Sequence, residues 1–150
     1  MRAVLQRVNY AEVSINESVH AKISNGIMVL LGIKSDDQLE DIKWLVSKIV
    51  NMRIFSDEEG LMNLSIQDIK GELLIISQFT LFASTKKGNR PGFINAARPE
   101  YANQIFEEFI KQLKEIFNGK IEKGVFGADM QIRLLNNGPV TIFIDSKNKE

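Results

Sequence analysis

Apolar and polar residues alternate through the first part of the chain, as is typical of strands with one buried face. The alternation covers residues 4–15 and again residues 19–23. Asn16-Glu17 and Asn25-Gly26 interrupt it with residue types that favour tight turns. The pattern therefore predicts consecutive half-buried strands joined by short turns.

Two later runs have no polar face. Residues 27–33 and residues 73–76 are apolar almost throughout, so we expect central strands that are covered on both sides. Near the C-terminus, residues 130–135 and 140–144 predict two more strands. Asn137-Gly138 lies between them and has the sequence of an ordinary hairpin turn.

Two segments have the spacing of amphipathic helices. For the first helix, Ser35 and Gln38 have the spacing of a capping box at its start. For the second, Pro99 suits the first turn and Gly119 the left-handed position after the end. Four acids crowd the start of the first helix, where we expect solvation and capping: Asp36, Asp37, Glu40 and Asp41. The buried stripes are Leu39, Ile42, Leu45, Val46, Ile49 and Val50, and then Ala102, Ile105, Phe106, Phe109, Ile110, Leu113, Ile116 and Phe117.

These elements predict one mixed α+β domain over residues 1–150. We expect a mostly antiparallel, barrel-like sheet of about seven or eight strands, with two main helices packed outside it.

The composition excludes several kinds of chemistry. There is no Cys and a single His, His20, so thiol nucleophiles, thiolate zinc sites and His pairs for metals are absent from the sequence. His20 lies in a strand-like context and is expected on an exposed strand face, which argues against a Ser–His–Asp triad. Nineteen basic and nineteen acidic side chains give a net charge of zero, so any RNA contact must be local. We expect no membrane span and no signal peptide, and a cytoplasmic location.

A polar stretch leaves the end of the apolar strand at residues 73–76. It consists of Ser77, Gln78, Phe79 and Thr80, a place where a strand holds polar groups rigidly. Ser77 or Thr80 could be a nucleophile, but the sequence offers no base to activate either. Backbone N–H groups could instead stabilise an oxyanion. The plain alternative is that these residues simply finish a strand.

Two loops carry further candidate chemistry. Residues 84–98 contain four basic residues and no acid, so this loop is either a solvated surface or a phosphate-binding flap over a site. Gly138-Pro139 is unusual for a hairpin, because a Gly-Pro bond can be cis and then directs its carbonyls where a trans chain cannot.

Several motifs together resemble the D-aminoacyl-tRNA deacylase family over the whole chain. They are residues 1–8, 29–33, 53–57, 62–64, 77–81, 127–130 and 137–141. The resemblance implies a deacylase-like fold and a homodimer with an active site at each subunit interface. It also implies hydrolysis of the ester between a D-amino acid, or mischarged glycine, and the 3′-terminal adenosine of tRNA.

The same resemblance assigns roles to individual residues. Gly138 and Pro139 would be joined by a cis bond, with Arg7 locking them, and their carbonyls would hold the substrate amino group in the partner's pocket. An L side chain would then collide with the backbone. Phe126 and Ala102 would flank the adenosine, and Met130 would also contact the substrate.

The residues at 77–80 would form the catalytic wall, with N–H groups near Phe79 and Thr80 facing the ester carbonyl. The expected mechanism uses the ribose 2′-hydroxyl of the substrate and needs neither metal nor cofactor. Two other classes stay open from the residues alone: a non-catalytic dimer that binds RNA ends or small ligands, and a small esterase with a seryl nucleophile.

Overall fold

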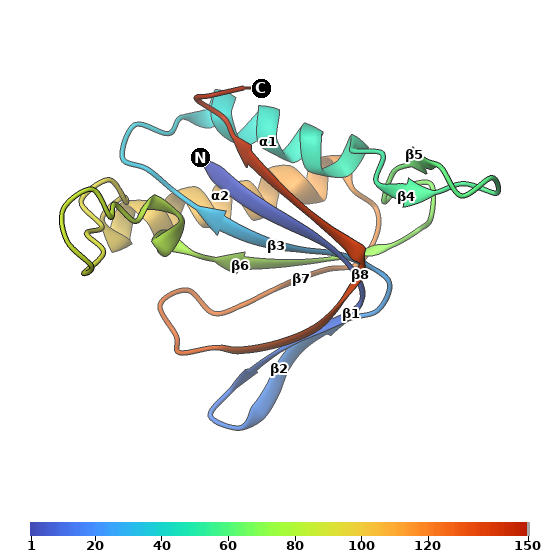
Figure 1. The fold of residues 1–150 in the computed structure, drawn as a ribbon, viewed down its shortest axis with the longest axis horizontal. Helices are drawn as coiled ribbons and strands as arrows, with labels where there is room; N and C mark the ends of the chain where they lie inside the picture. The colour runs from blue at the N-terminus through green and yellow to red at the C-terminus, as the bar shows by residue number, and fades with distance from the viewer. Residues whose placement is uncertain (150) are drawn as a thin grey trace.

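A long N-terminal strand organises the sheet of the computed structural model, which describes residues 1–149 (Figure 1). Strand β1 pairs antiparallel with β2, β3 and β8, and β3 continues in parallel with β6, which pairs in parallel with β7. The sheet order is β2-β1-β3-β6-β7, with β8 on β1. The strands are β1 (Arg2–Ile15), β2 (Ser18–Ile23), β3 (Gly26–Gly32), β6 (Glu72–Ser77), β7 (Ile121–Lys123) and β8 (Gln131–Asp145); β4 (Phe55–Ser56) and β5 (Met62–Leu64) form a separate ribbon.

The predicted fold class is confirmed: the structure is mixed α+β, with a nearly closed, barrel-like sheet and two main helices. Helices α1 (Leu39–Asn51) and α2 (Pro99–Ile116) cover one face of the sheet. The apolar runs at residues 27–33 and 73–76 become β3 and β6, the central strands, with almost every side chain buried. No helix in residues 1–149 has the length and apolar character needed to cross a membrane.

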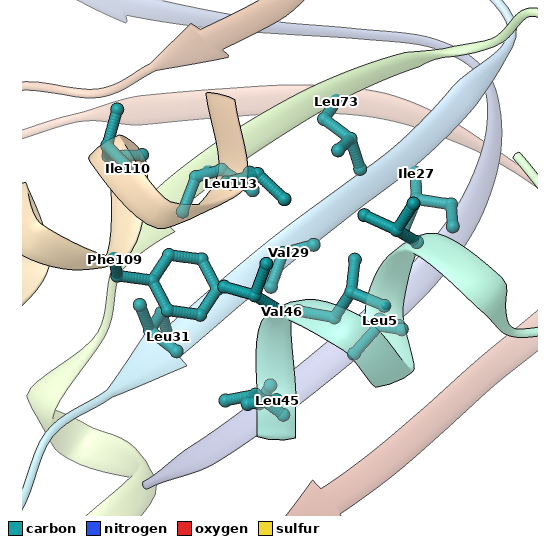
Figure 2. Packing of buried hydrophobic residues seen from close by; sticks show 14 of the residues in the cluster. Leu5, Ile27, Val29, Leu31, Leu45, Val46, Leu73, Phe109, Ile110 and Leu113 are labelled. Atoms are coloured by element: carbon teal, nitrogen blue, oxygen red, sulfur yellow. The ribbon is translucent and has the colours of Figure 1, made fainter. Parts of the chain in front are cut away.

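The main core lies between the helices and the sheet (Figure 2). Phe109 and Leu113 of α2 and Leu45 of α1 pack over Val29 and Leu31 of β3, and all five are at most 1% exposed. This burial follows from the helical spacing of the apolar residues, since each stripe faces the two-sided apolar run of β3. The core therefore fixes the far ends of β3 and β6, where the polar stretch at residues 77–80 begins.

The predicted hairpin near the C-terminus is wrong. Residues 131–145 form the single strand β8, and β1 pairs with it on both sides of Asn137-Gly138. Val8 faces Asn136 and Gln6 faces Thr141, so β8 bulges between these positions and keeps its direction. The Asn-Gly signal is local, whereas the continuous partner strand β1 decides the path of the chain.

Two predictions about the helix ends also need correction. The capping box of α1 uses Gln38 and Asp41 instead of Ser35 and Gln38. Helix α2 ends at Ile116 with Phe117 as its C-cap, and Gly119 is not left-handed. Gly119 is required for packing, because a Cβ there would lie 2.4 Å from the ring of Phe117.

Asp37 is not solvated, although its acidic surroundings in the sequence suggested that it would be. It is fully buried and accepts a hydrogen bond of 2.5 Å from the terminal ammonium of Met1. Ser146 also accepts from this ammonium, at 2.6 Å, and its hydroxyl donates to Asp41. Lys147 completes the network through a 2.7 Å ion pair with Asp41. Charges brought together from the two ends of the chain and the start of α1 thus neutralise one another.

Candidate active site

A cavity of about 480 Å³ opens where β3 and β6 end, next to the first turn of α2. Six residues predicted for the site line it: Ser77, Gln78, Phe79, Ala102, Phe126 and Met130. The rest of the lining is Leu31, Ile33, Ile76, Phe93, Ala96, Ala97, Pro99, Gly127, Ala128 and Ile132. The sequence motifs at 77–79 and 126–130, far apart along the chain, therefore meet around one cavity.

The polar wall of the cavity is the bend that follows β6. The N–H of Gln78 donates to the carbonyl of Leu31 at 2.7 Å, and a short 3₁₀ helix, η1 (Phe79–Phe82), follows at once. Gly32 packs closely against this bend, because a Cβ there would lie 3.1 Å from the carbonyl oxygen of Gln78. The first N–H groups of such a helix have no partner within it, so those of Phe79 and Thr80 are available to an incoming oxygen.

Thr80, predicted among the catalytic residues, lies outside the cavity lining and is exposed. Its hydroxyl accepts a hydrogen bond from the side-chain amide of Gln78. Phe79 is 57% exposed and lies edge-on to Phe93, with ring centroids 5.1 Å apart. The mouth of the cavity is thus framed by two aromatic rings.

The opposite wall is apolar. Phe126 packs against Phe106 of α2 with ring centroids 6.1 Å apart, and Ala102 lies on the same helix. Met130 packs against Gly124, where a Cβ would lie only 2.6 Å from the methionine sulfur. An apolar surface that includes an aromatic ring suits a nucleobase or another planar ring.

The cavity is uncharged. None of the residues within 1–149 that line it has a titratable side chain. Ser77 and Gln78 supply the polar side chains of the lining, and no base lies among the residues that surround them there. The arrangement can therefore orient a neutral ester and donate backbone N–H groups to it, but it offers no side chain to take a proton.

Arg7, Gly138 and Pro139 do not line this cavity. The Gly138-Pro139 bond is cis, and both residues are exposed. Arg7 fixes this segment: its Nε donates to the carbonyl of Asn137 at 3.0 Å and its Nη1 to the carbonyl of Ile54 at 2.6 Å.

The segment and the cavity lie at opposite ends of β3. Arg7 faces Ile27 at the start of this strand, whereas the cavity is lined by Leu31 and Ile33 at its end. Four to six residues of strand separate them, which is roughly 13–20 Å at about 3.3 Å per residue. Within one chain, Gly138 and Pro139 therefore lie well away from the cavity.

The basic loop at residues 84–98, predicted to be a solvated surface or a flap over a site, adds residues to the cavity lining that were not among the predicted site residues. Ser84 and Gly92 exchange two backbone hydrogen bonds of 2.8 and 2.9 Å, which close the base of the loop. The chain then returns along the cavity through Phe93, Ala96 and Ala97. The aromatic residue directly after Pro91-Gly92 was the available signal, since apolar residues are uncommon in a purely solvated loop.

The fold and the cavity together define a class: a barrel-like α+β domain with an uncharged pocket built on a strand end. Residues 4–145 match the family described as D-Tyr-tRNA(Tyr) deacylase. A D-aminoacyl-tRNA deacylase from Cytophaga hutchinsonii is 59% identical over the full length of both chains. One from Fusobacterium nucleatum is 53% identical over 99% of this chain and 97% of its own.

Two solved structures share the fold of this chain. One named c-Myc DNA Unwinding Element Binding Protein has a TM-score of 0.92 and 40% identity, and the match covers 97% of this chain and 98% of that one. A probable eukaryotic D-amino acid tRNA deacylase shares the fold, with a TM-score of 0.78 at 16% identity over 95% and 97% of the two chains. The chain belongs to the D-Tyr-tRNA(Tyr) deacylase family, and is thus a hydrolytic enzyme.

Proposed function

We propose that this enzyme hydrolyses the ester that joins a D-amino acid, or mischarged glycine, to the 3′-terminal adenosine of tRNA, as a proofreading activity in the cytoplasm. Relatives with 53–59% identity along nearly the whole chain bear the name D-aminoacyl-tRNA deacylase. The observation that carries the proposal is the uncharged cavity with a polar strand end on one side and an apolar wall on the other. The apolar wall of Phe126, Ala102 and Met130 suits the adenine ring.

The proposed chemistry relies on the substrate. The N–H groups of Phe79 and Thr80 stabilise the oxyanion as water attacks the ester carbonyl, and the neighbouring ribose 2′-hydroxyl assists the attack. The bond between the acyl carbon and the ribose oxygen breaks, water supplies the hydroxyl of the free D-amino acid, and the proton passes to the ribose oxygen. Because the lining has no titratable side chain, this route needs no enzyme base.

The proposal includes a homodimer whose second chain completes each pocket. Gly138 and Pro139 are exposed and lie about 13–20 Å along β3 from the cavity of their own chain. The β8 strand that carries them also exposes large apolar side chains, Leu135 at 49% and Phe143 at 56%. An exposed apolar strand face favours association with a second copy.

In this arrangement, the partner's carbonyls accept hydrogen bonds from the substrate amino group and so select substrates of the D configuration. The backbone lies where an L side chain would project, whereas a D side chain projects into open space. Glycine has no side chain to collide with this backbone and is therefore also accepted. Selection thus operates by steric exclusion, and the identity of the side chain has little influence.

Deacylation of D-Tyr-tRNA and L-Tyr-tRNA by the purified protein tests the activity. We expect release of D-Tyr only, and equal rates for both substrates would contradict the proposal. Binding without loss of the ester would favour an RNA-end binding protein, and labelling by a fluorophosphonate would favour a seryl esterase. Thr80→Ala is expected to keep most of the turnover, because its hydroxyl faces Gln78 outside the cavity.

Complementation between two variants tests the shared site. Ala128→Trp fills the cavity, and Gly138→Val disrupts the carbonyl segment, since a Cβ at Gly138 would lie 2.8 Å from Arg7 and the φ angle there is +128°. Each variant alone should be inactive. A refolded mixture should regain roughly a quarter of wild-type activity, because half of the dimers are mixed and each of these has one intact site. No recovery would mean that each chain works alone.

A further inference from the structure

A second groove lies on the other side of the basic loop. It has a volume of about 580 Å³ and is lined by Met1, Arg2, Lys34, Phe82, Ala83, Ser84, Thr85, Lys86, Asn95, Asp145 and Lys147. The loop separates it from the active-site cavity: Ser84, Thr85, Lys86 and Asn95 face the groove, whereas Phe93, Ala96 and Ala97 face the cavity. A molecule seated in the cavity therefore has the groove as its direct neighbour.

Most cations of the groove are neutralised within the protein. Arg2 pairs with Asp145 at 2.8 Å, Lys34 pairs with Asp36 at 3.2 Å, and Lys147 pairs with Asp41. These contacts leave little charge for a ligand.

The loop itself is different. Within residues 1–149, none of Lys86, Lys87, Arg90 and Arg98 has an ion-pair partner. Residues 84–98 contain no acid, although the whole chain has zero net charge. The positive charge of the loop is thus uncompensated locally, which produces a strong local potential. The hydrogen bonds between Ser84 and Gly92 hold the base of the loop closed.

We propose that Lys86, Lys87 and Arg90 bind the phosphates of the single-stranded nucleotides that precede the terminal adenosine, and that this strand leaves the cavity through the groove. The inference rests on the proposed function, which seats that adenosine against Phe126. A nucleoside in an uncharged cavity brings its backbone phosphates to the mouth. Lys86 lines the groove on that side, and Lys87 and Arg90 belong to the same loop. The phosphates position the strand without reading its sequence.

Binding and salt dependence test this proposal directly. The probe is a fluorescent single-stranded RNA tetranucleotide ending in adenosine, compared with adenosine alone. The variant is Lys86→Gln/Lys87→Gln, and the matched control is Lys111→Gln/Lys114→Gln on the exposed face of α2. For single strands, the logarithm of the affinity falls with the logarithm of the salt concentration with a slope of about −0.7 for each neutralised phosphate. If the two loop lysines each neutralise one phosphate, the fall in tetranucleotide affinity between 50 and 200 mM salt should be about 7-fold smaller in the loop variant than in wild type.

In the loop variant, we expect weaker binding of the tetranucleotide, a shallower salt slope and no matching change for adenosine. The same variant should lower kcat/KM for D-aminoacyl-tRNA relative to D-aminoacyl-adenosine, while the α2 control keeps the wild-type ratio. Equal tetranucleotide binding by wild type and loop variant would overturn the inference even if deacylation proceeds. Loop-dependent RNA binding without any deacylation would support the binding surface and refute the proposed activity instead.

Discussion

Arg7 offers the sharpest test of how the carbonyl segment works. Its guanidinium joins three parts of the chain: β1, the Asn137 carbonyl at 3.0 Å and the Ile54 carbonyl at 2.6 Å. A Cβ on Gly138 would lie 2.8 Å from Nη2, so the guanidinium is also packed against that residue. Replacing Arg7 with Ala removes two charge-assisted hydrogen bonds and leaves a space under the segment.

The size of the effect follows from these contacts. A hydrogen bond from a charged donor contributes up to about 3 kcal/mol when buried, and the half-exposed position of Arg7 lowers this to about 1 kcal/mol for each bond. The expected loss is therefore about 2 kcal/mol, which lowers the Tm by roughly 4–8 °C in a domain of this size. Activity should fall further, by about 100-fold, if the carbonyls move by about 1 Å.

Thermal unfolding and deacylation kinetics with D-Tyr-tRNA and L-Tyr-tRNA measure both effects. A merely structural role would reduce the active fraction and lower both rates equally, whereas loss of the positioned carbonyls should lower the D-to-L ratio of kcat/KM. Arg133→Ala is the control, because this arginine lies on the same strand pair in an exposed ion pair with Glu12 and should contribute less than about 1 kcal/mol. An Arg7→Ala enzyme with an unchanged D-to-L ratio would refute the reasoning.

Three further predictions concern the site and the fold. Gly32→Ala should cost about 1–3 kcal/mol and lower kcat, because its methyl group would lie 3.1 Å from the Gln78 carbonyl and displace the bend; urea unfolding and kinetics check this. Burial raises the pKa of Asp41, but hydrogen bonds led by that from Lys147 lower it to about 2. Asp41→Asn should therefore lose about 2 kcal/mol at pH 7, and the difference from wild type should vanish as the pH falls from about 4 through 2. His20→Gln should leave kcat unchanged, since that histidine is exposed on β2; a clear fall in the deacylation rate would contradict this.

The elements that sequence predicts best are those whose composition is imposed by burial alone. Strands β3 and β6 are covered on both faces, so each must be apolar throughout, and the sequence at residues 27–33 and 73–76 shows this directly. Pro99 likewise marks the start of α2, because a proline suits the first turn whatever the tertiary context.

The elements that sequence predicts poorly depend on partners distant in the chain. Asn137-Gly138 has a turn sequence, yet β1 pairs on both sides of it and keeps β8 continuous. Asp37 lies among acids and looks solvated, yet the ammonium of Met1, 36 residues away, is its buried partner. In both cases a non-local contact outweighs a correct local preference.

The ammonium group of the proposed substrate is a reason why this cavity would need a second chain. Ser77 and Gln78 are the polar side chains of its lining, and an amino-acid ester also carries an ammonium group that needs acceptors. Burying such a charge without acceptors would cost several kcal/mol. The cavity supplies N–H donors and apolar surface, which suit the carbonyl and the adenine but not the ammonium. We propose that the exposed segment of Gly138 and Pro139, which Arg7 holds at the opposite end of β3, is the complementary half. In the proposed dimer, each chain contributes its cavity to one site and its Gly138-Pro139 segment to the other.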